Sequence, residues 1–585
     1  MKNHSRVKLY LYIISILIGI SVLIAIRLSG SGPISDSGIL RNPGFEGTYT
    51  GAAPYWKVNS WGNPAPTFSV ERETRSSHVH NGRSAQRFRV ESLGGGAANL
   101  IQNFKFRKGH TYRASVWIKA SKATPVTVLL RRDAGAPWKA YAIKTVQAIA
   151  TWQQVTIRGS SPTDGSGSFR IAPKQSGTAL WVDDASLADV TPTSGSTSAS
   201  FSSDPIPDNY FGMHTNQLGW THDEWPAGNQ GMLRLWDTAV NWPQLETSND
   251  VWDWKRMDYL VNQAHKTDTD VIYTLGLTPQ WAASDATKTG PYKNSSTSPP
   301  TNMQDWRDYI RTVATRYKGK IKYYEIWNEP DYKGFYSGDV DKMVQMSRVA
   351  YEELKQVDPN IVVISPGLSD GQGMYWLDEY LFKSGGKYVD VIGYHWKFDL
   401  RPEDTTLRID NVRELMKIHG VAGKPLFNTE GAAMKDPASP PSVNEARGSV
   451  ARAYVLFWAH GVSNFNWFAW DIQVPHRVSL SETDDRTPTP AGIAYRQTVD
   501  WLHGARMVKL STNTDGTYVS EIVRADGYRG WIVWNETQSR TFTIPSSWGP
   551  TTKRDLAGGT ANIAGVTSVK IGPAPILLEN PNYRS

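Results

Sequence analysis

Two glutamates, Glu329 and Glu430, each follow a short apolar run and precede a residue that interrupts regular structure. The first lies in Trp327-Asn328-Glu329-Pro330 and the second in Asn428-Thr429-Glu430-Gly431. A lone glutamate is usually a surface or ion-paired residue. When two carboxylates face each other, one can protonate a leaving oxygen while the other attacks or activates water, which is the chemistry that breaks a glycosidic bond. That chemistry requires a fold that brings the two side chains together.

The region 207–505 alternates short apolar strands with amphipathic helices, a pattern typical of a parallel α/β fold. Eight such units predict a (β/α)8 TIM barrel, in which active-site residues lie at the C-terminal ends of the strands. Strands four and seven then place Glu329 and Glu430 across one barrel mouth. A doubly wound open sheet is the competing fold, but the glycine-rich phosphate loop that it would carry after its first strand is missing. The predicted strands begin near Tyr210, Met232, Val271, Lys322, Ile361, Val389, Pro425 and Asn464.

The segments on either side of this region have a different pattern. Residues 38–190 carry short alternating stretches between turn residues, which predict an all-β sandwich. Residues 191–206 are rich in Ser and Thr without apolar periodicity, which indicates a linker. Residues 506–585 return to β character. The predicted fold class is therefore multidomain, with an N-terminal β-sandwich (jelly roll), a central (β/α)8 TIM barrel and a small C-terminal β-sandwich, preceded by an N-terminal transmembrane helix.

The motifs at the predicted strand ends resemble glycoside hydrolase clan A. Ile326-Trp327-Asn328-Glu329-Pro330 and Thr429-Glu430 carry this resemblance. It implies that Glu329 is the general acid/base and Glu430 the nucleophile of a retaining enzyme that forms a covalent glycosyl-enzyme intermediate. Further motifs are similar to family 39 and its relatives, namely Gly212-Met213-His214, Arg234-Leu235-Trp236-Asp237, Thr278-Pro279-Gln280-Trp281, Gly393-Tyr394-His395 and Trp467-Phe468-Ala469-Trp470.

Polar and aromatic residues in these motifs are candidate substrate contacts. We expect Arg234 to supply positive charge beside Glu430, and Asn328 to hydrogen-bond the sugar 2-hydroxyl. His395 is expected either to orient Glu430 or to bind substrate. The tryptophans are candidate stacking platforms, although most of the 24 in this chain must pack in cores. The full set of candidates is Asn328, His395, Arg234, Trp281, Trp470, His214 and Tyr394.

The two carboxyls need different protonation states. Glu329 must keep its proton near neutral pH, so we expect burial or the charge of Glu430 to raise its pKa, while Glu430 must stay ionised. No His/Asp/Glu cluster has the spacing of a catalytic metal site. The chain has no cysteine, which excludes disulfides and thiolate chemistry. No cofactor for catalysis is therefore expected.

Two motifs at the ends of the N-terminal region, Asn42-Pro43-Gly44-Phe45-Glu46 and Trp181-Val182-Asp183-Asp184-Ala185-Ser186-Leu187, resemble jelly-roll carbohydrate-binding modules related to families 4, 9 and 22. In such modules the chain ends meet at a structural calcium ion. By this resemblance Glu46 and Asp184 would supply oxygen ligands, which calcium prefers. The alternative is that both carboxylates only cap turns.

The first thirty residues indicate the location of the protein. Lys2, Arg6 and Lys8 precede an uncharged run of 18 residues, Leu9–Ile26. As a helix this run is about 27 Å long, close to the roughly 30 Å hydrocarbon core of a bilayer. Residues 1–30 are thus either an uncleaved signal anchor or a signal peptide cleaved near Ser29-Gly30-Ser31. The protein is then either held at the cell membrane with an extracytoplasmic catalytic domain or secreted.

These features predict a hydrolase of an extracellular or cell-envelope polysaccharide. Because a binding module tethers an enzyme to polymer, internal cleavage is the first hypothesis. An exo-acting β-xylosidase-like or uronic-acid-releasing enzyme and a transglycosylase are alternatives. A non-catalytic polysaccharide-binding scaffold is the alternative from another class. The net charge of +8 is small for 585 residues and does not indicate a nucleic-acid partner. The sequence does not indicate a protein partner.

Overall fold

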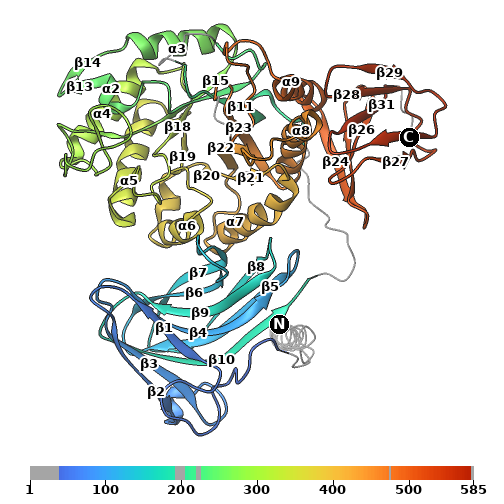
Figure 1. Cartoon of the computed structure of the whole chain (residues 1–585). Helices are drawn as coiled ribbons and strands as arrows, with labels where there is room; N and C mark the ends of the chain where they lie inside the picture. The colour runs from blue at the N-terminus through green and yellow to red at the C-terminus, as the bar shows by residue number, and fades with distance from the viewer. Residues whose placement is uncertain (1–37, 192–203, 219–224, 473–475, 582–585) are drawn as a thin grey trace, which may run out of the picture.

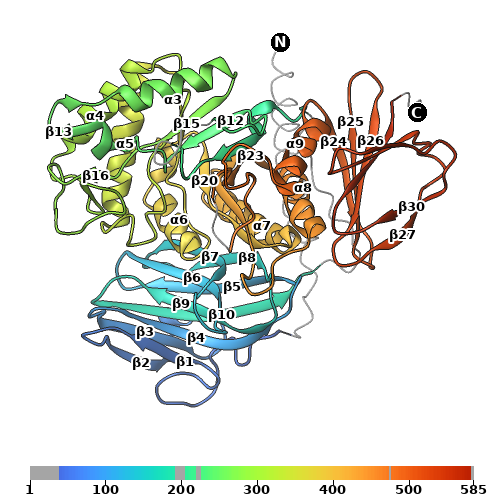
Figure 2. The same cartoon turned by 45° about the horizontal axis from the view of Figure 1, so that its top comes forward.

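The computed structural model describes residues 38–191, 204–218, 225–472 and 476–581. The chain forms a β-sandwich module, a central barrel and a C-terminal β domain, with the module beneath the barrel and the C-terminal domain at its side (Figures 1 and 2). The predicted anchor or signal, residues 1–30, lies outside the described residues, as does most of the predicted linker. Within the described part of the chain, no helix is long and apolar enough to span a membrane.

The N-terminal module is a sandwich of two five-stranded antiparallel sheets, as predicted. Their strand orders are β1-β4-β9-β6-β7 and β2-β3-β10-β5-β8. Alternate residues of each strand enter the core between the sheets, as the two-residue period of a strand dictates. The strands are β1 (Lys57–Trp61), β2 (Thr67–Glu73), β3 (Ala85–Ser92), β4 (Ala97–Phe106), β5 (Thr111–Ala120), β6 (Thr124–Arg132), β7 (Ala140–Ala148), β8 (Gln153–Ser160), β9 (Gly165–Pro173) and β10 (Thr178–Asp189), with a 3-10 turn η1 (Ser76–His78).

The central domain is the predicted parallel eight-stranded barrel. Its strands pair in the order β19-β18-β15-β12-β11-β23-β22-β20. Two isolated parallel bridges, Ile364–Val391 and Leu368–Tyr394, connect the two ends of this order. All eight predicted strand positions are occupied. The barrel strands are β11 (Phe211–His214), β12 (Met232–Leu235), β15 (Asp270–Thr274), β18 (Tyr323–Glu325), β19 (Val362–Ile364), β20 (Ile392–Tyr394), β22 (Leu426–Met434) and β23 (Val462–Phe468).

Amphipathic helices surround the barrel. In α4 the residues Trp306, Tyr309, Ile310 and Val313 are all buried against it. Burial of such a side chain stabilises the fold by about 1.5–3 kcal/mol. The helices are α2 (Trp242–Leu245), α3 (Lys255–Lys266), α4 (Met303–Arg316), α5 (Val340–Val357), α6 (Gly373–Phe382), α7 (Thr406–Ile418), α8 (Val443–Ala459) and α9 (Pro490–Leu502). Shorter elements are η2 (Asp208–Tyr210), η3 (Gly385–Tyr388), η4 (Pro402–Thr405), β13 (Glu246–Ser248), β14 (Val251–Trp252), β16 (Thr278–Pro279), β17 (Ser295–Ser296) and β21 (Lys397–Asp399).

The C-terminal domain consists of a six-stranded sheet, β24-β25-β26-β31-β28-β29, and a two-stranded sheet, β27-β30. It is joined to the barrel by a buried carboxylate, Glu403, which accepts hydrogen bonds from Arg452 of α8 and from the indole of Trp534. The strands are β24 (Arg506–Thr512), β25 (Thr517–Val523), β26 (Arg529–Asn535), β27 (Arg540–Thr543), β28 (Thr552–Asp555), β29 (Thr560–Asn562), β30 (Ser568–Ile571) and β31 (Ile576–Asn580).

The module is docked on helices α6 and α7 of the barrel by buried polar contacts. Asn411 of α7 accepts a hydrogen bond from the backbone N–H of Ser160 at 2.7 Å and donates one to its carbonyl at 2.8 Å. Asp378 of α6 accepts from the backbone N–H of Thr145 at 3.0 Å. Leu129 of β6 belongs to the same apolar cluster as the barrel core. These contacts hold the module in one position against the barrel.

We expect Asn411→Ala to weaken the contact between the module and the barrel, because it leaves the buried N–H and C=O of Ser160 without their Asn411 partner. The expected loss is about 1–3 kcal/mol in the free energy of unfolding. Thermal unfolding should begin at lower temperature, and small-angle scattering should give a larger radius of gyration. The matched control is Lys108→Ala, which removes an exposed ion pair with Asp404 and should change little. An Asn411→Ala protein that unfolds and scatters like the parent would contradict the docking.

Candidate active site

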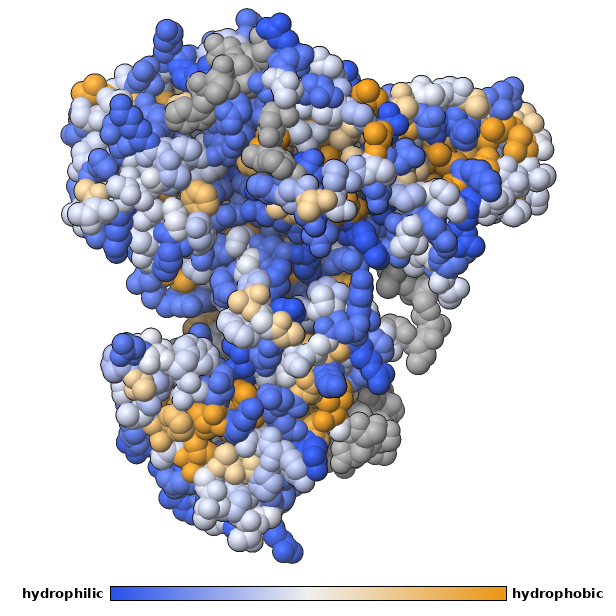
Figure 3. Space-filling model, viewed as in Figure 1, coloured by the Kyte–Doolittle hydropathy of each residue, from blue (hydrophilic) through white to orange (hydrophobic). Residues whose placement is uncertain are grey.

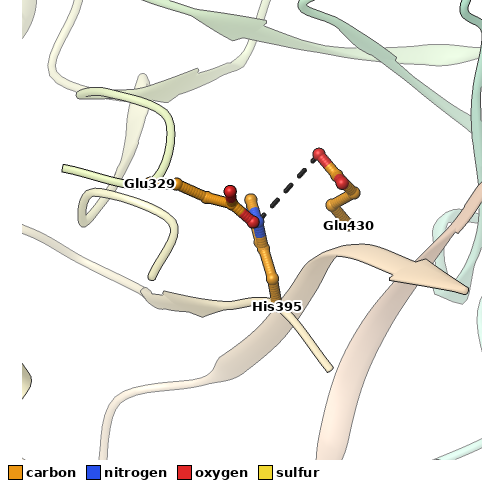
Figure 4. A group of neighbouring side chains, drawn as sticks. All are labelled: Glu329, His395 and Glu430. Atoms are coloured by element: carbon orange, nitrogen blue, oxygen red, sulfur yellow. Dashed lines mark hydrogen bonds and ion pairs between the residues drawn. The ribbon is translucent and has the colours of Figure 1, made fainter. Parts of the chain in front are cut away.

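The barrel brings Glu329 and Glu430 together, as predicted. Glu329 follows β18 and Glu430 lies within β22, and both side chains point toward one another beside the ring of His395 (Figure 4). One ligand atom from each of these three residues lies within 4.8 Å of the other two. Carboxyl groups about 5–5.5 Å apart suit direct attack by one of them, whereas a separation of about 6.5–9.5 Å leaves room for a water. Two carboxylate oxygens within 4.8 Å of each other fit the shorter separation better than the longer one.

The backbone at Glu329 is held in an unfavourable conformation that aims its side chain. Its φ is +40°, in the left-handed region, which costs a residue with a Cβ about 1–2 kcal/mol. Its backbone N–H donates to the carbonyl of Gly367 at 2.7 Å, and Pro330 follows at once. Strain of this kind persists where the surrounding structure over-determines it, and it is common at functional sites.

Gly367 leaves room for the polar groups behind the two carboxylates. A Cβ at this position would lie 2.5 Å from His395 Nε2 and 2.6 Å from Glu325 Oε1. Both distances are shorter than an ordinary van der Waals contact, which is 3.4–4 Å. Any larger residue would therefore displace His395 or Glu325. The glycine is required by close approach of side chains, which a sequence pattern does not reveal.

His395 contacts the acid candidate more closely than the nucleophile candidate. Its Nδ1 lies 3.0 Å from Glu329 Oε1 and 4.0 Å from Glu430 Oε2, and its Nε2 lies 3.0 Å from the hydroxyl of Thr429. A threonine hydroxyl can donate or accept. The ring can thus donate to an ionised Glu329 or accept from a protonated one, so the contact survives both protonation states. His395 therefore contacts Glu329 more closely than Glu430. One of the two expectations was that it orients Glu430.

Arg234 ties Glu430, and Asn328 beside Glu329, to the barrel. Its Nη1 donates to Glu430 Oε2 at 3.2 Å, and its Nη2 donates to Asn328 Oδ1 at 2.6 Å and to Glu325 Oε2 at 2.6 Å. Its side chain is fully buried. Positive charge does lie beside Glu430, as expected, and contact of the buried Arg234 with substrate stays a prediction. The oxygen of Asn328 faces Arg234, so its amide nitrogen is left to donate, as recognition of a sugar hydroxyl requires.

His214 supports this arginine. Because a guanidinium can only donate, His214 Nδ1 accepts from Arg234 Nη1 at 3.4 Å, and its Nε2–H is left to donate to Asp237 Oδ2 at 2.8 Å. Tyr292 in turn donates to the other oxygen of Asp237. His214 is fully buried. These contacts position Arg234, and contact of His214 with substrate stays a prediction.

The electrostatic surroundings separate the two carboxyls. Burial would raise the pKa of Glu430, but nearby His395 and the positive charges of Lys397 and Arg234 outweigh it and hold that pKa far below the usual value. Burial also acts to raise the pKa of Glu329, as does the charge of Glu430, but the hydrogen bond from His395 and the charge of Lys397 hold it below the usual value. Because Arg234 acts on Glu430 in addition to these two residues, we expect the first proton that reaches the pair to bind Glu329. The expectation of a raised pKa for Glu329 was wrong for the ligand-free site.

Lys397 was missed in the sequence. Its Nζ lies 3.6 Å from Glu329 Oε1 and 3.9 Å from Glu430 Oε1. The signal was present, because Lys397 follows His395 by two residues and the side chains of an extended segment alternate between faces. Thr429 and Glu325, two further members of the site, stand next to predicted residues on their strands but lack any motif of their own.

Three aromatic candidates differ in how far they are buried. Trp470 is fully buried, and its indole donates to the carbonyl of Asp485. Tyr394 is buried and packs on Trp396. Contact of either side chain with substrate stays a prediction. Trp281 is half-buried and donates to the carbonyl of Glu246, so only part of its ring is open to solvent.

The two predicted calcium ligands lie on either side of Gly44. A Cβ on Gly44 would be 3.6 Å from Glu46 Cγ and 3.9 Å from Asp184 Oδ1. Glu46 accepts from the backbone N–H of Arg83, and Asp184 Oδ2 lies 2.6 Å from His80 Nδ1. The carboxylates are thus close and hard oxygen donors suit calcium, although each also has a hydrogen-bond partner of its own.

A parallel barrel with two facing carboxylates at its strand ends defines the fold and site of a glycosidase. Residues 247–438 match the family model described as Glycosyl hydrolases family 39, and residues 37–174 match that described as Carbohydrate binding domain. The chain therefore contains a family 39 glycosyl hydrolase domain and an N-terminal carbohydrate-binding domain, as the resemblance predicted.

Solved structures with the same fold have diverged far in sequence. A family 39 β-xylosidase from Caulobacter crescentus is 19% identical with a TM-score of 0.50, over 66% of this chain and 98% of the other. A glucosidase from Croceicoccus marinus is 13% identical with a TM-score of 0.50, over 65% of this chain and 97% of the other. At these sequence identities the structural similarity supports the barrel fold but does not identify the substrate.

We expect Lys397→Met to move the alkaline limb of the pH profile of kcat/KM to higher pH. Lys397 lowers the pKa of Glu329, so removing its charge raises that pKa, and Glu329 keeps its proton to higher pH. The side chain is about one third exposed, so solvent screening should limit the shift to about 1 pH unit or less. Lys417→Met, on the exposed face of α7, is the control and should leave the limb in place. A limb that moves to lower pH would contradict the assignment.

Proposed function

We propose that this protein is a retaining glycoside hydrolase that cleaves an extracellular or cell-envelope polysaccharide, with Glu329 as acid/base and Glu430 as nucleophile. The observation that carries the proposal is the pair of carboxylates within 4.8 Å, of which one is surrounded by cationic side chains. This spacing supports direct attack on the anomeric carbon. The charge difference supports the assignment of the two roles.

In the first step Glu329 donates its proton to the glycosidic oxygen while a carboxylate oxygen of Glu430 attacks the anomeric carbon. The bond from that carbon to the leaving oxygen breaks, the leaving sugar departs as an alcohol, and an ester to Glu430 forms. In the second step the ionised Glu329 takes a proton from water as the water oxygen attacks the same carbon. The ester bond breaks, and Glu430 is released as a carboxylate.

The charges at the site favour the role of Glu430 in the first step and of Glu329 in the second. His395, Lys397 and Arg234 keep Glu430 ionised and ready to attack. When Glu430 becomes an ester, its negative charge disappears, and with it one of the influences that raise the pKa of Glu329. Glu329 is then more acidic than in the free enzyme and favours the carboxylate form, as its role as base in the second step requires.

The carbohydrate-binding domain is held against the barrel by buried hydrogen bonds. A binding domain attached in this way supports action on a polymer, and therefore internal cleavage. The family 39 protein from Caulobacter crescentus is a β-xylosidase, which makes an exo-acting enzyme the second candidate. A panel of polysaccharides with measurement of product lengths separates them. A ladder of oligosaccharides supports internal cleavage, and a single accumulating monosaccharide supports the exo mode.

We expect Glu329→Gln to lower kcat on a natural glycan by about 10²–10⁴-fold, the usual contribution of a general acid, and Glu430→Gln to abolish turnover. An aryl glycoside with a good leaving group should lose far less with Glu329→Gln in its first step, because departure then needs no proton. Glu352→Gln, on the exposed face of α5, is the control. Proton NMR of the first product should show the same anomeric configuration as the substrate. Inversion, or full activity of both active-site variants, would overturn the mechanism.

The calcium prediction for Glu46 and Asp184 is part of this proposal. If the ion binds the folded module, calcium at about 100 times its Kd stabilises it by about 2.7 kcal/mol. The midpoint of thermal unfolding should rise with calcium and fall with EDTA, and Asp184→Asn should remove this dependence. If calcium has no effect on the parent protein, the two carboxylates only cap turns.

A further inference from the structure

The segment 367–370 runs from the catalytic side of the barrel to the module. It lies between β19 and α6, starts beside Glu329 and ends beside the β6–β7 turn of the module. In the space-filling view, the surface where the module meets the barrel is mostly hydrophilic (Figure 3). Polar contacts therefore join the two domains on this face.

The first three residues of the segment bind the acid/base candidate or residues next to it. The carbonyl of Gly367 accepts the backbone N–H of Glu329 at 2.7 Å, and the next carbonyl accepts that of His395 at 2.8 Å. Ser369 donates its backbone N–H to Asp331 at 2.9 Å, and its hydroxyl donates to the same carboxylate. The segment thus holds Glu329, its hydrogen-bond partner and the loop that follows it.

The fourth residue, Asp370, binds both the module and the barrel. Lys139, the residue before β7, lies with its Nζ 3.0 Å from Asp370 Oδ2, and Arg408 of α7 donates to the same oxygen. The side chain of Asp370 is 15% exposed and that of Arg408 is 17% exposed. These ion pairs are therefore less screened by solvent than ordinary surface pairs. One carboxylate joins the module to the segment.

Arg408 connects this junction to a second residue of the site, Lys397. Its Nη2 donates to the carbonyl of Lys397 at 3.0 Å and to the hydroxyl of Thr405 at 2.7 Å. On the side of β22, the carbonyl of Trp396 accepts from the backbone N–H of Ala432. Successive carbonyls of a strand point to opposite edges. Arg408 thus holds the edge of β21 that β22 does not pair.

We propose that the module is a structural part of the active site and that Asp370 is a positioning residue for the proposed reaction. Lys139 and Arg408 hold Asp370, which fixes the end of the segment behind Glu329. Arg408 also fixes the backbone of Lys397, whose ammonium lies beside both carboxylates. A domain that only tethers an enzyme to polymer would leave the ligand-free site unchanged. The inference rests on the proposed acid/base role of Glu329, but its test needs no turnover.

The pKa of Glu329 reports whether the site keeps its geometry. The charged or titratable side chains that face its carboxyl are His395, Glu430, Lys397 and Asp331. Loss of the negative charge of Asp370 would by itself lower the pKa of Glu329. Displacement of Lys397 takes a positive charge away from the carboxyl and raises that pKa. The direction of the change therefore separates positioning from a simple charge effect.

The test is a ¹³C NMR titration of Glu329 in the full-length, ligand-free protein, combined with hydrogen exchange of the backbone amides of Glu329 and His395. In Asp370→Ala the pKa of Glu329 should rise by up to about 1 pH unit, the limit set by complete loss of Lys397. Both amides should exchange about tenfold faster, because the carbonyls that bind them are no longer held in place.

Two further variants test the module and the bridge separately. Lys139→Met should speed exchange of the same amides by a smaller factor, about threefold, because Arg408 still holds Asp370. Arg408→Lys keeps the charge but has one nitrogen in place of a fork, so it cannot bind both Asp370 and the carbonyl of Lys397. The pKa of Glu329 should therefore rise in this variant too.

The controls are Asp341→Ala and Lys108→Met. The first removes a surface ion pair with Lys383, and the second removes another ion pair between the module and the barrel, with Asp404. Neither control should change the pKa of the acid/base candidate or the two exchange rates.

Three results would overturn the proposal. If the pKa of Glu329 falls or stays the same in either Asp370→Ala or Arg408→Lys, the segment does not position the site. If Lys139→Met exchanges like the parent, the module is not part of the site. If Lys108→Met changes exchange as much as Lys139→Met does, any contact between the domains has this effect and the path through Asp370 is wrong. Because both measurements are made without substrate, each result stands whether or not Glu329 is the acid/base.

Discussion

The guanidinium of Arg234 connects three strands at the mouth of the barrel. From β12 it reaches Glu325 on β18, Asn328 just beyond that strand and Glu430 on β22. A fully buried cation needs such partners, and removal of one partner of a buried pair typically costs about 3–5 kcal/mol. The same bonds fix the position of the nucleophile candidate and keep it ionised. Stability and chemistry at this site therefore depend on one set of interactions.

The asymmetry between the two carboxyls follows from where the cations lie. Arg234 is on the side of Glu430, whereas His395 makes its short contact with Glu329. Lys397 is nearly equidistant from both carboxylates. Two glutamates of the same chemistry thus acquire different proton affinities, which is the general way in which one fold provides an acid and a base together.

Much of the architecture was predictable from local pattern. Strand periodicity and turn residues indicated the sandwich and all eight barrel strands, and the rule that barrel active sites lie at strand ends selected Glu329 and Glu430. Side-chain direction was not predictable at the ends of short strands, where one residue of register reverses the face. For that reason the sequence did not show that Trp470 and Tyr394 are buried, and Lys397 was overlooked.

The docking of the module also lay beyond sequence pattern. A Ser/Thr-rich linker suggests independent domains, yet Asn411 and Asp378 of the barrel helices bind backbone groups of the module. These contacts join residues more than two hundred positions apart and carry no local signature. They turn a tethered domain into a fixed neighbour of the barrel, where Lys139 of the module reaches Asp370.

The most direct test of this account is a titration of the two carboxyls by ¹³C NMR. In protein labelled at the glutamate side-chain carboxyls, the variants Glu329→Gln and Glu430→Gln identify the two resonances by difference. The account predicts that on acidification Glu329 takes the first proton while Glu430 stays ionised to distinctly lower pH. If Glu430 is protonated first, or if both carboxyls titrate together at the ordinary value for glutamate, the assignment of roles is contradicted.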